Sequence, residues 1–200
     1  DATPTMISTW PGLHERGLYG VAIDLGSTTV AAHLTNLDTG EVVASSGIMN
    51  PQIRFGEDLM SRVSYAMMNP GGDQEMTRAV RDAINALVSE IARDAGITTD
   101  LILEAVFVCN PVMHHLLLGI DPVELGQAPF ALATSEALNL SAHDLHLNAL
   151  PASAQIHILP CIAGHVGADA AAVALAEEPG KSEDLVLIVD VGTNAEILLG

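Results

Sequence analysis

Two short stretches of the chain place an aspartate, a glycine and several hydroxyl or amide side chains directly after an apolar run. The first reads Asp24-Leu25-Gly26-Ser27-Thr28, followed by Thr29, and the second reads Asp190-Val191-Gly192-Thr193-Asn194. Glycine permits a sharp turn and a close backbone approach, and the amides and hydroxyls after it can cradle phosphate oxygens. An aspartate at a buried strand end is costly without a partner, and a hydrated magnesium ion suits it.

A single copy of this pattern is a weak signal, because it also fits an ordinary strand turn that is capped by its own aspartate. Here two copies align without a gap, and each follows an apolar strand. The pair therefore indicates a duplicated lobe with a nucleotide bound between the two copies.

The composition limits the classes of partner. The formal net charge is −18, with seven Lys and Arg in 200 residues, which argues against binding to nucleic acid or to an anionic membrane. A phosphate site must then rely on backbone amides and metal. The sequence has neither an apolar run of membrane-spanning length nor a basic stretch before an apolar one at its start. Cys109 and Cys161 are isolated thiols, so we expect a reducing, cytoplasmic setting.

The first elements that position these residues are strands. Residues 20–25, 30–37 and 41–48 predict three antiparallel strands, with Asp38-Thr39-Gly40 as a hairpin turn between the last two. An amphipathic helix is then predicted from an N-cap at Asp73 to a glycine stop at Gly96.

A strand at residues 104–109 and a helix from Pro111 to Gly119 follow. The order strand, strand, strand, helix, strand, helix is that of a ribonuclease-H-like half of an actin-type fold. A fifth strand is expected at residues 156–159, before an Ala-rich helix that Asp169 opens. Strands at residues 185–190 and 195–199 begin the second copy.

The predicted fold class is therefore α/β: a ribonuclease-H-like lobe with a mixed five-stranded sheet and flanking helices, and the start of a second such lobe. We assign residues 1–17 to a linker or N-terminal arm and residues 18–177 to the first lobe, with an irregular insertion at about residues 121–154. Residues 178–200 give the first strands of the second lobe, which we expect to be truncated.

Two sets of polar residues are open to more than one interpretation. Asp58 and Arg62 lie four residues apart on a predicted helix and could form a surface ion pair. Alternatively, Arg54 and Asp58 could face the cleft beside the first phosphate turn, which is the turn from Gly26 to Thr29. His143 and His146, three residues apart, fit either a pair of metal ligands or a solvated polar face.

The chain resembles the superfamily of acetate and sugar kinases, heat-shock chaperone ATPases and actin. Within it, the chain is most similar to the ATP-dependent reductive activators of corrinoid proteins. The segments that carry this resemblance are AIDLGSTTVAAHL (residues 22–34), NPQIRFGEDLMSR (50–62), CNPVMHHLLLGIDP (109–122), LPCIAGHVGADAAA (159–172) and DVGTNAEILLG (190–200).

The resemblance implies a larger protein with an N-terminal ferredoxin domain that carries a 2Fe–2S cluster, a middle region and a C-terminal ATPase domain. Such activators use ATP to drive the reduction of Co(II) corrinoid to Co(I) in methyltransferase systems. This chain would be the front part of the ATPase domain, with ATP, Mg²⁺ and a corrinoid protein as ligands and partner. The unfinished sheet favours a homodimer. We expect the segment alone to be inactive.

The resemblance also implies roles for individual residues. Gly26, Ser27, Thr28 and Thr29 would bind the β- and γ-phosphates from one lobe, and Gly192, Thr193 and Asn194 would bind them from the other. Asp24 and Asp190 would hold magnesium through its waters. The acid that orients the attacking water would be Asp169, whose alternative role is a plain helix N-cap; with Asp24 it makes up the predicted catalytic pair.

Two other functions fit the same fold. A small-molecule kinase would add a fixed acceptor pocket with an aspartate aimed at a hydroxyl group. A non-catalytic, actin-like module would couple nucleotide state to assembly without turnover.

Overall fold

A mixed sheet of six strands organises the chain in the computed structural model, which describes residues 6–181, 183–191 and 195–200. Its strands run in the order β3-β2-β1-β4-β6-β5. Their bounds are β1 (Tyr19–Leu25), β2 (Thr29–Asn36), β3 (Val42–Met49), β4 (Ile102–Cys109), β5 (Leu138–Ser141) and β6 (Gln155–Ile158). The first three form the predicted antiparallel meander. β4 runs parallel to β1, and β6 runs parallel to β4.

The prediction of a mixed α/β sheet is confirmed, but the predicted number of five strands is wrong. The sixth strand, β5, pairs antiparallel with β6 at the edge of the sheet and lies inside the stretch expected to be irregular. It has four residues, in which Leu138 and Leu140 alternate with Asn139 and Ser141. A strand of four residues is too short for its alternation of apolar and polar residues to be distinguished from the surrounding loop.

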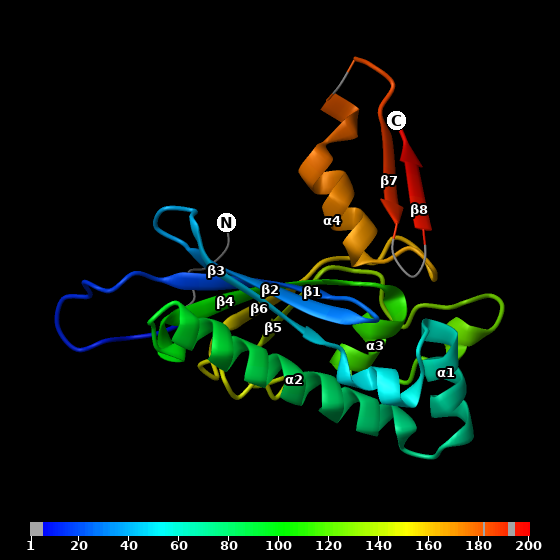
Figure 1. The fold of residues 1–200 in the computed structure, drawn as a ribbon, viewed down its shortest axis with the longest axis horizontal. Helices are drawn as coiled ribbons and strands as arrows, with labels where there is room; N and C mark the ends of the chain where they lie inside the picture. Colours follow the sequence, from blue (N-terminus) through cyan, green and yellow to red (C-terminus); the bar gives the residue numbers. More distant parts are fainter. Residues whose placement is uncertain (1–5, 182, 192–194) are drawn as a thin grey trace.

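One face of the sheet is covered by the long helix α2 (Gly72–Asp94) and by α3 (Pro111–Leu118), as Figure 1 shows. The predicted apolar stripe of α2 is fully buried, and Gly96 follows the helix at φ +69° as its expected stop. The start differs from the prediction, because Gly71 in a left-handed conformation is the N-cap and Asp73 lies in the first turn. The acidic side chain there still complements the positive end of the helix dipole.

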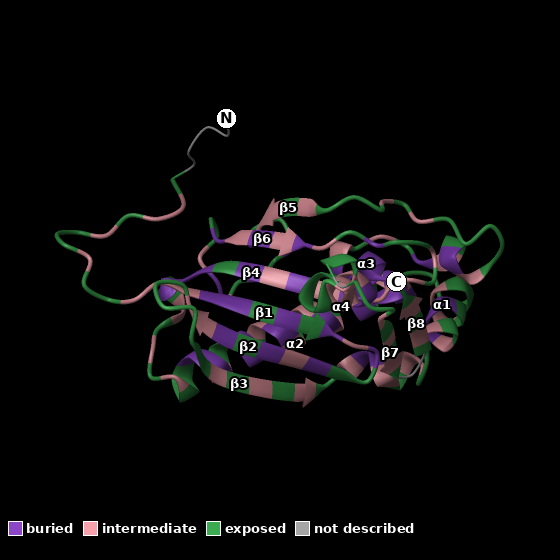
Figure 2. Ribbon diagram, turned by 90° about the horizontal axis from the view of Figure 1, so that it is seen from above, coloured by how far each residue is buried: buried purple, intermediate pink, exposed green. Residues whose placement is uncertain are grey.

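The opposite side of the sheet carries a separate group of elements at one end (Figure 1). Helix α4 (Ala168–Glu177) and the hairpin of β7 (Leu187–Val191) and β8 (Ala195–Leu199) stand there, at the predicted positions of the Ala-rich helix and the last two strands. The rest of this face is open, and β1, β2 and β3 show partly and fully exposed residues on it (Figure 2).

Shorter segments connect these elements. Asn50 caps a 3-10 helix (Pro51–Phe55), which leads into α1 (Leu59–Met68), and further 3-10 turns occur at Thr99–Leu101, Val123–Gly126 and Pro179–Lys181. Residues 6–17 contain neither helix nor strand. Among the described residues, no helix is long and apolar enough to cross a membrane.

Candidate phosphate-binding site

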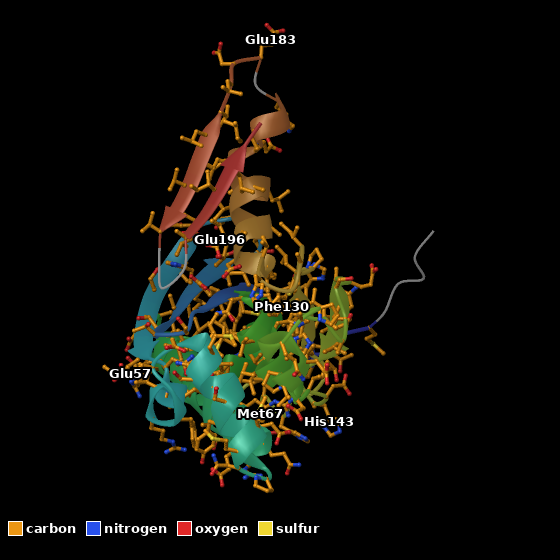
Figure 3. The ribbon with its side chains drawn as sticks, turned by 90° about the vertical axis from the view of Figure 1, so that its right-hand side faces the viewer. Glu57, Met67, Phe130, His143, Glu183 and Glu196 are labelled. Atoms are coloured by element: carbon orange, nitrogen blue, oxygen red, sulfur yellow. The ribbon has the colours of Figure 1, made fainter. Side chains whose placement is uncertain are left out.

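A cavity of about 330 Å³ lies where the carboxyl ends of β1 and β4 meet the first turn of α4 and the β7–β8 hairpin. Its described lining residues are polar apart from one leucine and one glycine. They are Asp24, Gly26, Ser27, Thr28, Thr29, Leu59, Asn110, Asp169, Asp190 and Glu196. Figure 3 shows Glu196 at the end of the hairpin nearest the sheet, whereas Glu183 lies at its far end.

The turn that the sequence predicts after β1 lies between the end of β1 at Leu25 and the start of β2 at Thr29. A side chain at Gly26 would place its Cβ 2.7 Å from the Thr29 carbonyl oxygen, so glycine is required for the tight return into β2. The turn is also held from outside, since the Asn50 side-chain amide donates to the Gly26 carbonyl at 2.8 Å and the Asn50 backbone amide donates to the Thr28 carbonyl at 2.8 Å. The sequence NPQ after β3 thus supports the turn after β1.

Burial and neighbouring carboxylates raise the pKa of Asp24, Asp169 and Glu196. Burial raises the pKa of Asp24, and the nearby charges of Asp169 and Asp190 raise it further. Burial likewise raises the pKa of Asp169, opposed by the Ala170 amide and reinforced by Asp190. The pKa of Glu196 is raised by burial and then by the same two aspartates. Because no Lys or Arg is among the described lining residues, this concentration of negative charge favours the binding of a cation.

Oxygen ligands of this kind are those that magnesium prefers. Across the described part of the chain, no three His, Cys, Asp or Glu side chains converge closely enough to hold a metal ion directly. The arrangement suits an ion that keeps its own waters and meets the carboxylates through them. His143 and His146 lie in a turn segment between β5 and β6, not on a helix face, and neither lines the cavity.

The structure brings most of the predicted site residues together. Asp24, the turn from Gly26 to Thr29, Asp169 and Asp190 all line the one cavity, although they come from distant parts of the sequence. The remaining predicted ligands, Gly192, Thr193 and Asn194, lie outside the described residues.

Asp169 is not the N-cap of α4. That position belongs to Gly167, and Asp169 is the second residue of the helix, with its Oδ1 accepting from the Ala170 amide at 2.9 Å. Gly167 presses against β4, because an added Cβ would lie 2.5 Å from the Cys109 carbonyl oxygen. The close approach brings the first turn of α4, and with it Asp169, to the cavity.

Two polar lining residues were missed by the sequence analysis. Glu196 pairs directly with Asp190 across the β7–β8 hairpin, and counting across the turn would have found it. Asn110 follows β4 as Gly26 follows β1, and Leu25 and Cys109 are register partners in this parallel pair. Parallel neighbours end at the same edge of the sheet, so Asn110 could have been expected beside the turn.

Neither interpretation of Arg54, Asp58 and Arg62 is correct. Asp58 caps α1 by accepting from the Ser61 amide at 2.7 Å, and the Arg54 guanidinium lies 4.6 Å from the ring centre of Phe55. In the described part of the chain, Asp58 forms no ion pair with either arginine, and neither Asp58 nor Arg54 lines the cavity. The side chain that reaches the phosphate turn is the buried Arg62, which donates to the Ser27 carbonyl.

Comparison with known proteins places the chain in a family. The family model described as "RACo middle region" matches residues 19–181. The chain belongs to this family. It is 33% identical over 186 residues to the corrinoid activation enzyme RamQ of Eubacterium limosum, an alignment that covers 93% of this chain and 31% of RamQ. A solved structure of a reductive activator for a corrinoid, iron–sulfur protein superposes with a TM-score of 0.90 at 32% identity, over 94% of this chain and 30% of the other.

The chain thus spans about a third of the length of these relatives. The resemblance to corrinoid activators that the sequence motifs carry is confirmed. The matched description is a middle region, whereas the resemblance placed the segment at the front of the C-terminal ATPase domain.

Proposed function

We propose that this chain forms the phosphate- and magnesium-binding part of an ATPase within an ATP-dependent activator of corrinoid proteins. The observation that carries the proposal is the single cavity in which the turn after β1 meets carboxylates from α4, β7 and β8. Asp24 and Asp190, the first residues of the two motif copies, line this cavity from separate sheets. That arrangement fits a ribonuclease-H-like first lobe at residues 18–177 and the opening of a second lobe at residues 178–200.

The roles follow from the chemistry of the lining residues. The turn from Gly26 to Thr29 binds the β- and γ-phosphates with its amides and hydroxyls. Asp24 and Asp190 would hold a magnesium ion through its waters, and the ion would screen the phosphate charge. Asp169 orients a water molecule toward the γ-phosphorus and accepts its proton. Gly192, Thr193 and Asn194 bind the phosphates from the second copy.

The proposed purpose of this ATPase follows from the relatives. RamQ is a corrinoid activation enzyme, and the solved relative is a reductive activator for a corrinoid, iron–sulfur protein. We infer that the protein containing this chain couples ATP binding and hydrolysis to the reduction of Co(II) corrinoid to Co(I). The electron comes from a 2Fe–2S domain elsewhere in that protein. The protein acts as a homodimer, and its partner is a corrinoid protein.

Calorimetric titration of the full-length protein with Mg·ATP tests the proposal. The Asp24→Asn protein should lose measurable binding, because the carboxylate that holds the hydrated ion is gone. Asp82→Asn is the matched control, since it removes one exposed negative charge from α2, on the covered side of the sheet. A wild-type protein that binds no Mg·ATP would show that the ATPase proposal is wrong.

Turnover separates the proposal from the two alternative functions. The proposed activator hydrolyses ATP without an added acceptor, whereas a small-molecule kinase requires one. Nucleotide-dependent association of the full-length protein without any turnover would instead identify an assembly module.

A further inference from the structure

The phosphate turn has its carbonyl groups bound from the side away from the cavity. The carbonyls of Gly26 and Thr28 accept hydrogen bonds from Asn50, each at 2.8 Å. The Ser27 carbonyl between them accepts a hydrogen bond from Nη2 of Arg62. Three successive peptide groups of the turn are therefore oriented by the segment that follows β3.

This orientation decides where the amides of the turn point. In a trans peptide the N–H lies opposite the C=O of the same peptide unit. Donors behind the Gly26 and Ser27 carbonyls thus turn the amides of Ser27 and Thr28 the other way. The cavity is lined by the turn from Gly26 to Thr29. The hydrogen bonds from Asn50 and Arg62 therefore direct the amide dipoles of the turn toward an anion bound there.

Arg62 is an unusual residue to find in this place. It is 0% exposed, and among the described residues it forms no ion pair with a carboxylate. Its Nε donates to the Gly56 carbonyl at 3.0 Å, and its Nη1 lies 3.1 Å from Sδ of Met113 and 3.4 Å from Oε1 of Gln52. Burial, opposed by the charge of Asp58, lowers the Arg62 pKa to about 10, so the guanidinium stays charged at neutral pH. A buried charge that has no carboxylate in direct contact is costly.

The negative charge of a bound phosphate would offset the cost of burying the guanidinium charge. The guanidinium sits directly behind the Ser27–Thr28 peptide group, and a phosphate would sit in front of it. A cation bound to the carbonyl polarises the peptide and strengthens its N–H as a donor. The same positive charge attracts the phosphate through the turn in a medium of low dielectric.

We propose that Arg62 is a positioning residue of the phosphate turn, which fixes the Ser27 carbonyl and supplies the buried positive charge that favours phosphate binding. This inference rests on the proposed function. It gives the site the cationic support that its described lining residues lack.

A second arginine provides the comparison that separates this role from simple packing. Arg81 is partly buried on α2 and also binds a backbone carbonyl, with Nε and Nη2 donating to the Leu117 oxygen at 3.0 and 2.8 Å. That carbonyl lies in the last turn of α3, where a cation stabilises the helix dipole. Arg81 therefore has a structural explanation that does not involve the cavity.

The experiment measures affinities of the full-length protein for Mg·ATP and for adenosine by calorimetry. Arg62→Met should lower the affinity for Mg·ATP by about 10- to 100-fold, the range of a lost charged hydrogen bond, and leave the affinity for adenosine nearly unchanged. Arg62→Lys should lower it less, because the charge remains but one ammonium cannot reproduce the fork of donors. Arg81→Met should leave both affinities unchanged, although thermal unfolding will show a loss of stability.

The inference is overturned if Arg62→Met weakens Mg·ATP and adenosine by the same factor, or if it behaves as Arg81→Met does. It is also overturned if both Arg62 variants fail to fold while Arg81→Met folds, since Arg62 would then be a folding residue. Failure of the proposed function gives a different result: the wild-type protein itself binds no Mg·ATP, and the inference fails with it.

Discussion

Acid should destabilise this chain through one buried histidine on α3. His114 is 0% exposed, and neither of its ring nitrogens has a hydrogen-bond partner in the described structure. Burial, followed by the neighbouring His115, lowers the pKa of His114 from 6.5 to about 4. The imidazole is therefore neutral in the folded protein at neutral pH, and protonation requires a charge to be buried among apolar residues.

The size and the sign of the effect follow from this shift. The pKa in the folded state lies below the unfolded value of 6.5, so the unfolded chain binds the proton first. The contribution to stability is complete above pH 6.5 and is lost as the pH falls toward 4. At 1.36 kcal/mol per pKa unit, the loss at pH 4.5 is about 2.5 kcal/mol.

Urea unfolding of residues 1–200, followed by circular dichroism at pH 7.5 and pH 4.5, measures this loss. The His114→Leu variant should lose about 2.5 kcal/mol less than the wild type between the two pH values. At pH 7.5 it should be more stable by about 1–3 kcal/mol, because two unsatisfied buried nitrogens are removed. The exposed His143, changed to Leu, serves as the control and should retain the wild-type dependence on pH.

Comparing variant with wild type removes the contribution of the cavity carboxylates, whose raised pKa values give both proteins the opposite slope. If His114→Leu showed the same acid loss as the wild type, the assignment of that loss to the buried imidazole would be wrong.

Three further changes test the site. Asp169→Asn should keep the affinity for Mg·ATP and reduce ATP turnover by about 10²- to 10⁴-fold, the range for a lost general base; an unchanged rate measured by phosphate release would remove Asp169 from that role. Gly167→Ala should cost about 1–3 kcal/mol in urea unfolding, since its Cβ would lie 2.5 Å from the Cys109 carbonyl oxygen, whereas Gly180→Ala meets nothing within 4 Å and should be neutral. Without magnesium, the free energy of unfolding should fall as the pH rises above 3.8 and through the raised pKa values of Asp24 and Asp169, and it should recover when magnesium is added. A pH profile of stability that magnesium leaves unchanged would contradict the mutual repulsion of these carboxylates.

The parts of the fold that were predicted correctly depend on patterns among residues that are close in the sequence. The meander of β1, β2 and β3 was placed to within a residue or two, because apolar runs and the turn at Gly40 are local signals. Helix α2 was recognised from its apolar spacing, and the tight turn at Gly26 from its glycine and hydroxyls. Such features depend on residues that are neighbours in the sequence.

The parts that sequence did not predict depend on contacts between distant residues. Arg62 follows a helix cap in the sequence and looked like half of a surface pair, but in the fold it points inward to the Ser27 carbonyl, 35 residues away. Glu196 enters the cavity because of the hairpin register with Asp190. Strand β5 exists because β6 offers it an edge. The partners of Arg62 and of β5 cannot be identified without the tertiary arrangement, whereas the partner of Glu196 follows from the local hairpin register.

If the proposed function is correct, the distribution of charge around the cavity would make the site depend on a metal–nucleotide complex. Asp24, Asp169, Asp190 and Glu196 line the cavity, whereas Arg62 is not among its described lining residues and contacts the turn from behind. Free ATP would meet uncompensated carboxylates and be repelled, and free magnesium would lack the phosphate oxygens that complete its shell. Magnesium reduces the repulsion between ATP and the carboxylates, and ATP supplies oxygen ligands to magnesium, so the two should bind with positive coupling. Under the proposed function, such a site would respond to the intact Mg·ATP complex and would lose its balance of charge when the γ-phosphate leaves.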